Sequence, residues 1–314
     1  MGPIAQSVEQ RTFNPWVVGS IPTGPTKVQN GRTTQREALM SNLNDYRSNI
    51  FTKAGLKACP GYGEDGVFKK IFSTIGTSKN PRCVEFGELR VLGTTSRAFR
   101  LTYFAKAYYF SGSFDFKSKI LNVLDVFKLI FQTLDLKYFK FFFNMPKKFF
   151  VTPENLLRTI PMDFISSEID LFVVDIDSFD FEIVSLILEA GIRPRVFVVE
   201  YNPSLPTRGK FAWRFYMSPS AKTNPRMYGA SYECWSEIFA ELDYKLVHIS
   251  GFCNLIYIRG DLENNFRVPD IDSEVTDTNE KVLEFAKLHC LEGFKPSWIS
   301  SPYLTLEEKA KLSL

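Results

Sequence analysis

Acidic side chains follow two apolar runs of the chain, at the point where each run ends. Asp175 and Asp177 close the run LFVVDID (171–177), and Glu200 closes VFVVE (196–200). A helical stretch separates the runs, and this pattern is typical of a βαβ unit in a parallel sheet buried on both faces. Because ligands of open α/β sheets bind beyond the carboxyl ends of the strands, we expect these acids in a functional site.

The spacing of these acids suits two kinds of chemistry. Asp175 and Asp177 stand two residues apart, so their side chains point the same way on a strand. Repulsion between close carboxylates raises the pKa of one of them, which suits a general base, and paired carboxylates also hold hard divalent cations through their oxygens. We therefore predict catalytic roles for Asp175, Asp177 and Glu200, with a divalent cation as a candidate cofactor.

Asp180 and Asn202 flank these acids and are predicted to bind substrate. Each has a structural alternative. Asp180 precedes the helical stretch and would also serve as a helix cap. Asn202 shares a side with Glu200, but Asn202 followed by Pro203 is also typical of a plain turn.

A second candidate site follows the run RCVEF (82–86). Gly87 comes next and permits a tight turn that lets a cofactor approach the backbone. Asp115 would end the following strand, where an acid accepts hydrogen bonds from ribose hydroxyls. The alternatives are an ordinary strand-ending turn at Gly87 and a surface acid at Asp115.

Alternating strands and helices are predicted to position these residues. Predicted strands are 82–86, one ending at 113–115, 148–151, 171–176, 196–202, 244–249 and 254–259. Predicted helices begin at 67, cover 96–108, begin at the sequence TPEN with Thr152 as N-cap, follow Asp180, and cover 231–242. This order predicts a doubly wound α/β sheet of seven strands that closes with a hairpin.

Composition limits the classes of function. The chain has 314 residues, 45% of them hydrophobic, and a formal net charge of +3, which is too small to argue for nucleic acid. Its five cysteines form no CxxC pair, so we expect a reduced, cytoplasmic protein without structural zinc. No apolar stretch is long enough to span a bilayer.

The segment 117–150 is rich in phenylalanine and lysine. We predict a helical insertion over 117–147. A basic, aromatic-rich amphipathic helix is typical of peripheral membrane contact, and the alternative is a lid helix over the substrate whose lysines are solvated.

Several sequence blocks occur together between about 58 and 262. They are GEDG (63–66), VEFG (84–87), VTPEN (151–155), DIDSFD (175–180), EYNP (200–203) and the segment 229–261. Together they resemble the FkbM-like S-adenosylmethionine-dependent methyltransferases, in particular a poorly characterised branch of that family. The resemblance implies a Rossmann-like, seven-stranded class I methyltransferase sheet, parallel with an antiparallel last strand.

The resemblance also implies a cofactor, a substrate class and site residues. S-adenosylmethionine would be bound by Glu85, Gly87, Gly93, Asp115 and Thr152. A hydroxyl of a sugar, a glycan or a similar small metabolite would accept the methyl group. One departure concerns the first loop: the family continues VEFG with an Asp-Gly pair, whereas this chain has Arg90 and places its next glycine at Gly93.

Two other functions fit the same acids. The sequence Asp175-Ile176-Asp177 after an apolar strand resembles the DxD motif of metal-dependent glycosyltransferases, in which the acids hold Mn²⁺ or Mg²⁺ against a sugar-nucleotide diphosphate. The altered loop after Gly87 favours instead a non-catalytic, degenerate methyltransferase fold.

The N-terminal region reads differently from the rest. Residues 2–27 resemble the translation of a lysine tRNA gene, because their codons permit each arm and an encoded CCA end in register. We therefore expect 1–39 to be a spurious or disordered extension with the natural start at Met40, and a bacterial or related genome. The expected domains are a methyltransferase-like domain at 40–262 and a helical tail at 263–314.

Overall fold

The computed structural model describes the part of the chain that carries the predicted sheet. The described residues are 42–46, 64–87, 94–112, 116–133, 147–202, 212, 228–250, 253–262 and 265–270. The chain divides into two compact units, Met1–Leu39 and Met40–Leu314, and the described residues all belong to the second. The predictions for Gly93, for Asp115 and for the helical tail beyond 270 lie outside the described residues.

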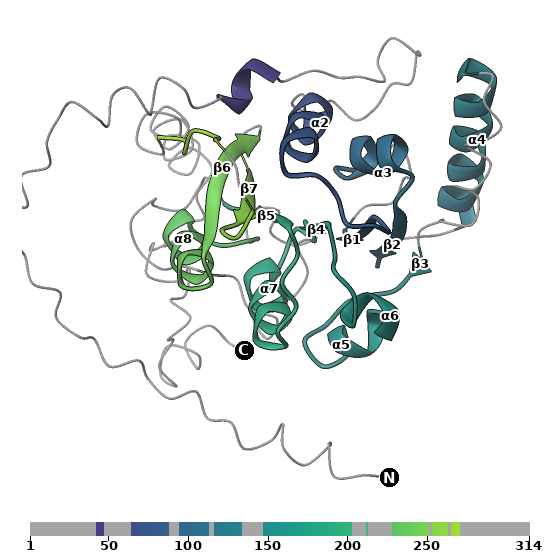
Figure 1. The fold of residues 1–314 in the computed structure, drawn as a ribbon. Helices are drawn as coiled ribbons and strands as arrows, with labels where there is room; N and C mark the ends of the chain where they lie inside the picture. The colour runs from purple at the N-terminus through teal and green to yellow at the C-terminus, as the bar shows by residue number, and fades with distance from the viewer. Residues whose placement is uncertain are drawn as a thin grey trace, which may run out of the picture. The chain divides into compact units, whose positions relative to one another are not determined.

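The described strands form one sheet in the order β3-β2-β1-β4-β5-β7-β6 (Figure 1). They are β1 (Arg82–Phe86), β2 (Lys106–Ser111), β3 (Lys147–Lys148), β4 (Leu171–Val174), β5 (Val196–Glu200), β6 (Tyr244–Ser250) and β7 (Asn254–Arg259). Strand β7 runs antiparallel to both of its neighbours, and the remaining pairs are parallel. A mostly parallel α/β sheet that closes with an antiparallel hairpin is thus confirmed, although β3 contributes only two residues.

Helices cover both faces of the sheet. They are η2 (Leu43–Tyr46), α2 (Glu64–Ile75), α3 (Arg97–Tyr103), α4 (Phe116–Thr133), α5 (Leu156–Thr159), α6 (Met162–Ile165), α7 (Asp180–Glu189) and α8 (Tyr232–Glu241). Strand side chains alternate between the faces. Helices α2 and α3 lie on one face and α5 to α8 on the other (Figure 1). In β5, Val196 and Val198 belong to the core on the α2 and α3 side, whereas Phe197 and Val199 belong to the core on the α5 to α8 side. Burial on both faces explains why the central strands are almost wholly apolar.

Several element boundaries differ from those predicted. Strands β3, β4 and β5 are shorter than predicted, ending at Lys148, Val174 and Glu200. Helix α2 begins at Glu64 rather than at 67, and its first turn carries two acids, which a helix N-terminus favours. Helix α3 ends at Tyr103, after which Phe104 takes a left-handed φ of 52° and β2 begins, so β2 ends at Ser111 rather than at 113–115. Thr152 is not the N-cap, because α5 follows Asn155.

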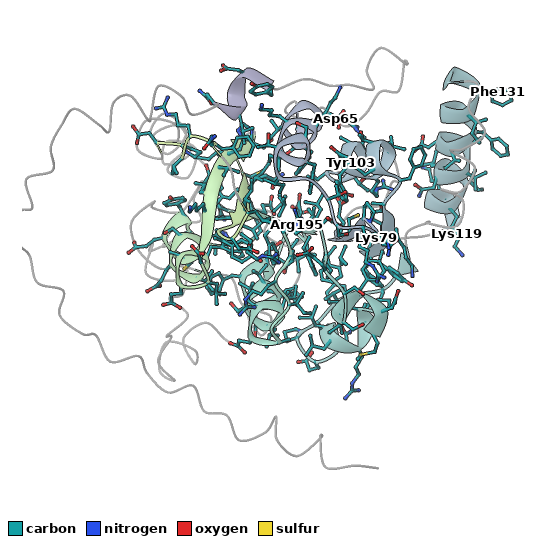
Figure 2. All side chains as sticks on the ribbon, viewed as in Figure 1. Asp65, Lys79, Tyr103, Lys119, Phe131 and Arg195 are labelled. Carbon is teal, nitrogen blue, oxygen red and sulfur yellow. The ribbon has the colours of Figure 1, made fainter. Side chains whose placement is uncertain are left out.

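Helix α4 has one buried face and one exposed apolar face. Asn122 and Val126 are fully buried. Large apolar side chains that recur at helical spacing are exposed: Ile120, Val123, Leu124, Phe127 and Phe131. Lys119 and Phe131 are labelled on this helix in Figure 2. Among the described residues, no helix is long and apolar enough to cross a membrane.

Peripheral membrane contact through 117–150 stays a prediction, and α4 gives it a test. Leu124 is 56% exposed and Phe131 75% exposed. We expect the full-length chain to sediment with anionic phospholipid vesicles more than with neutral ones, and Leu124→Glu with Phe131→Glu to remove the bound fraction, since burial of apolar side chains drives interfacial binding. Val268→Glu, at an exposed apolar residue outside α4, is the control. Equal sedimentation of all three proteins would contradict the prediction.

Candidate functional site

One row of residues crosses the sheet at the carboxyl ends of its parallel strands. Val174 pairs with Val199, so the next residues along, Asp175 and Glu200, stand side by side, and Glu200 itself pairs with Asn254 of β7. By alternation, these side chains lie on the face covered by α2. On the other side of Asp175 the row continues through residues that follow or end β1 and β2, namely Gly87 and Ser111. We call these five residues the edge row.

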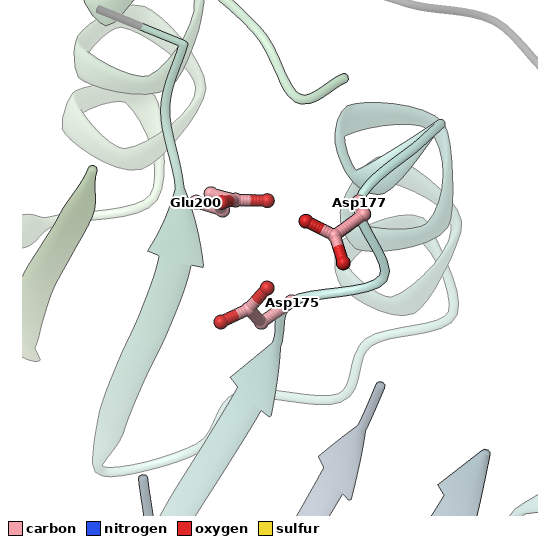
Figure 3. Close-up of side chains that lie close together, drawn as sticks. All are labelled: Asp175, Asp177 and Glu200. Atoms are coloured by element: carbon pink, nitrogen blue, oxygen red, sulfur yellow. The ribbon is translucent and has the colours of Figure 1, made fainter. Parts of the chain in front are cut away.

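The three predicted catalytic acids come together at this edge (Figure 3). Each of Asp175, Asp177 and Glu200 offers a carboxylate oxygen, and these oxygens lie within 4.8 Å of one another. Glu200 is buried, Asp175 half-buried and Asp177 exposed, so the group opens toward solvent on the Asp177 side. We call these three residues the carboxylate cluster.

Burial and mutual repulsion make the cluster electrostatically unfavourable. Burial raises the pKa of Asp175 well above its ordinary range, and the neighbouring acids Asp180 and Asp177 raise it further. Burial likewise raises the pKa of Glu200, with further contributions from Asp175. The Oε2 atom of Glu200 is buried without a hydrogen-bond partner, and within the described residues no basic side chain pairs with the cluster. Such a group of acids is suited to bind either a proton or a cationic ligand.

The turn between β4 and α7 fixes the position of Asp177. Asp177 has a left-handed φ of 53°, which is uncommon for a residue other than glycine. Asp180 stabilises this turn, because its two carboxylate oxygens accept hydrogen bonds from the backbone N–H groups of Ile176 at 2.8 Å and Ser178 at 3.0 Å. Both oxygens of Asp180 are therefore used within the protein, and its substrate-binding role stays a prediction.

Asn202 also makes contacts within the protein. Its side-chain amide donates to the carbonyl oxygen of Tyr228 at 3.0 Å, and its backbone N–H donates to Ala230 at 2.9 Å. The backbone N–H of Gly229 donates to Ser178 at 2.7 Å. These bonds hold 228–230 beside the β4–α7 turn, and the pKa of Tyr228 is raised by burial and then by Glu200.

Glu85 anchors the start of α3. Its carboxylate accepts hydrogen bonds from the backbone N–H groups of Thr95 at 3.0 Å and Ser96 at 3.2 Å, and from the Ser96 hydroxyl. The side chain is 2% exposed. These contacts are structural, and the predicted contact of Glu85 with a cofactor stays a prediction.

Gly87 is fixed by a close approach of two backbone segments. Its φ is 118°, and a Cβ atom there would overlap the carbonyl oxygen of Asp175. Its own N–H donates to Phe110 at 2.9 Å, and its carbonyl oxygen lies 3.5 Å from the Ser111 hydroxyl. The glycine therefore allows β1 to turn directly against β4. Thr152, another predicted cofactor residue, lies in the turn before α5.

Three residues near the cluster were not predicted. Glu64, the first residue of α2, is buried and accepts a hydrogen bond from Asn254 at 3.4 Å, and burial raises its pKa. The thiol of Cys253 also has a raised pKa, through burial and then through Glu200. The sequence signal that could have identified Glu64 was the GEDG block, which places two adjacent acids next to glycines. Acids that are buried at the start of a helix need hydrogen-bond partners or ligands.

Comparison with known proteins identifies no family for this chain. No protein-family model matches it, and no curated protein sequence matches it. Among solved structures, the SAH-bound methyltransferase PaMTH1 of Podospora anserina is similar with a TM-score of 0.34 and 14% identity, over 77% of this chain and 100% of that chain. A likeness at this level carries no function over to the chain.

The Gly87 contact predicts a large loss of stability on substitution. Gly87→Ala would push β1 away from β4, and we expect a loss of more than about 3 kcal/mol in the free energy of unfolding. Gly76→Ala is the matched control: Gly76 also has a positive φ, of 70°, but a Cβ atom there meets nothing within 4 Å. Gly76→Ala should lower the free energy of unfolding by only about 1 kcal/mol. Equal losses in urea unfolding would contradict the proposed close approach.

Asp180 predicts a pH dependence of stability. Burial raises its pKa from the ordinary 3.8 to about 6. The folded state thus holds the proton of Asp180 more tightly than the unfolded state does. The stabilisation that this proton gives is fully present below about pH 3.8 and is lost as the pH rises through about 6. Asp180→Asn removes this titration. Its free energy of unfolding relative to wild type should therefore rise by roughly 3 kcal/mol between about pH 4 and about pH 7.

The measurement is urea unfolding across this pH range. Asp45→Asn, the same change at an exposed residue, should give a curve parallel to wild type. A parallel curve for Asp180→Asn as well would show that Asp180 does not titrate as its burial requires.

Proposed function

We propose that this chain is an S-adenosylmethionine-dependent methyltransferase. The observation that carries the proposal is the strand order β3-β2-β1-β4-β5-β7-β6 with β7 antiparallel. This is the order of the Rossmann-like class I methyltransferase sheet that the FkbM-like sequence blocks imply. The strand order reverses between β1 and β4, and open α/β sheets bind ligands at that point, beyond the carboxyl ends. Gly87 and Asp175 occupy this point.

The chemistry of the edge suits this cofactor. S-adenosylmethionine carries a positively charged sulfonium and an ammonium group. Four acids lie at this end of the sheet, namely Glu64, Asp175, Asp177 and Glu200. Within the described residues, no basic side chain pairs with the carboxylate cluster that the last three form. A cationic ligand would relieve their repulsion. Gly87 lets the end of β1 lie directly against the backbone of Asp175 at this point of the sheet.

The cluster also provides a base for a hydroxyl acceptor. When bound, S-adenosylmethionine supplies a methyl group that leaves its sulfur as the acceptor oxygen attacks. Burial raises the pKa of Asp175 and Glu200, so either carboxylate is a stronger base than an ordinary one and is suited to take the hydroxyl proton. The rest of the contribution is orientation of the two reactants, and the proposed acceptor is a sugar or a similar hydroxylated metabolite.

A metal-dependent glycosyltransferase is the second candidate. The close approach of the Asp175 and Asp177 carboxylates favours it, because a DxD motif needs two acids around one cation. The antiparallel hairpin of β6 and β7 within the same sheet is not a feature that this candidate predicts. The third candidate, a degenerate fold without catalysis, is favoured only by the sequence of the loop after Gly87.

Calorimetric titration of the full-length chain with S-adenosylmethionine and S-adenosylhomocysteine tests the proposal. We expect saturable binding of both. Asp115→Ala should weaken it by about 10- to 100-fold, since hydrogen bonds from ribose hydroxyls to a carboxylate would be lost. Asp45→Ala, at an exposed residue of η2, is the control and should leave binding unchanged.

Two results would contradict this assignment at different levels. Binding of neither compound would overturn the methyltransferase proposal, and binding of a sugar nucleotide with Mn²⁺ would then favour the second candidate. Normal binding by Asp115→Ala would overturn only the assignment of Asp115 to the ribose.

A further inference from the structure

We infer that the carboxylate cluster of Asp175, Asp177 and Glu200 binds one hard divalent cation, Mg²⁺ or Mn²⁺. The geometry supports a single ion. The three carboxylates each offer an oxygen, all within 4.8 Å of one another. A Mg²⁺ ion at about 2.0–2.1 Å from each ligand keeps its ligand oxygens within about 4.2 Å of one another. Small side-chain rotations would therefore bring the three carboxylates onto one ion.

The second observation is a buried oxygen that has no partner. Glu200 is 6% exposed, and its Oε2 atom has no hydrogen-bond donor within the described structure. A buried carboxylate oxygen without a donor is costly, so such a group is expected to be paired or to coordinate a metal. Figure 3 shows the Glu200 side chain directed toward the space between Asp175 and Asp177.

The surrounding structure holds the cluster rigidly. Trp235 is fully buried, and its indole N–H donates to the Glu200 carbonyl oxygen at 3.1 Å, which fixes the end of β5 and leaves the carboxylate free. Asp180 fixes the turn that carries Asp177. Preorganised ligands lose little conformational entropy on binding, which favours the ion.

The three ligands differ in exposure, so the site opens toward solvent on one side. Glu200 and Asp175 lie on the protein side, whereas Asp177 is exposed. Three protein ligands leave about three positions of an octahedral ion for water or for substrate oxygens. If the proposed methyltransferase function holds, on which this step rests, the ion would bind the acceptor hydroxyl on the solvent side and favour loss of its proton. Asp175 and Glu200 would then act as ligands of the ion and not as the base themselves.

The test uses the full-length chain after treatment with a chelator. Mn²⁺ is titrated into the protein without any nucleotide, and the free ion is followed by electron paramagnetic resonance at neutral pH. We expect one saturable site per chain and competition by Mg²⁺. Asp177→Asn should weaken Mn²⁺ binding by at least about tenfold, because it removes a charged ligand. Asp177 is exposed, and asparagine tolerates a left-handed φ, so this variant should keep the fold.

Two further variants complete the design. Glu200→Gln tests the buried ligand and should also lose the site, with its fold checked by circular dichroism. Glu241→Gln makes the same change at an exposed residue of α8 and should bind Mn²⁺ as wild type does. No saturable binding by wild type, or unchanged binding by Asp177→Asn, would overturn the inference and leave a proton shared by Asp175 and Glu200 as the explanation of the cluster.

The test of the cation site and the test of the proposed methyltransferase function can fail independently of each other. Mn²⁺ binding without S-adenosylmethionine binding would keep the cation site and remove the methyltransferase proposal. Binding of S-adenosylmethionine without Mn²⁺ binding would do the reverse.

Discussion

The parallel register of β4 and β5 is the constraint on which the candidate site depends. Because Val174 pairs with Val199, the residues that follow them are neighbours, and both are acids. The same register fixes the face on which they lie, since side chains alternate along a strand. Two carboxylates are thus brought together on the face covered by α2, by the backbone pairing of the strand ends that carry them. The apolar cores on both faces make any slip of this register costly, and so they maintain the proximity of the two acids.

Two sets of acids among the described residues differ in their hydrogen-bond partners. Asp65 forms a bidentate ion pair with Arg97 that joins α2 to α3, and Glu85 and Asp180 accept backbone hydrogen bonds that fix the start of α3 and the β4–α7 turn. These acids stabilise local structure. The carboxylate cluster has no comparable donors among the described residues, and Glu200 Oε2 has none at all. This difference in hydrogen-bond partners is the basis for the proposal that the cluster binds an external cation.

The sequence predicted the βαβ unit well because its apolar runs have clear ends and because the acids follow them directly. The closing hairpin was predicted for the same reason, because a glycine between two apolar runs, here Gly251, is a strong sequence signal for a turn. Local signals failed where contacts between distant segments decide the structure. Threonine is a favoured N-cap residue, but α5 begins after Asn155 and not after Thr152. The glycine-rich sequence GEDG indicates a turn, so the start of α2 at Glu64 was not predicted. The hydrogen bond between Glu64 and Asn254 joins residues far apart in the chain, so no pattern of spacing predicts it.

The anchoring of both ends of the segment between β1 and α3 has an evolutionary consequence. Gly87 is held against Asp175 at one end, and Glu85 binds Thr95 and Ser96 at the other. A side chain at position 87 would collide with the backbone of Asp175, and loss of the carboxylate at position 85 would leave the first N–H groups before α3 without their acceptor. Selection is therefore expected to keep a glycine at 87 and an acid at 85 in any descendant that keeps this sheet.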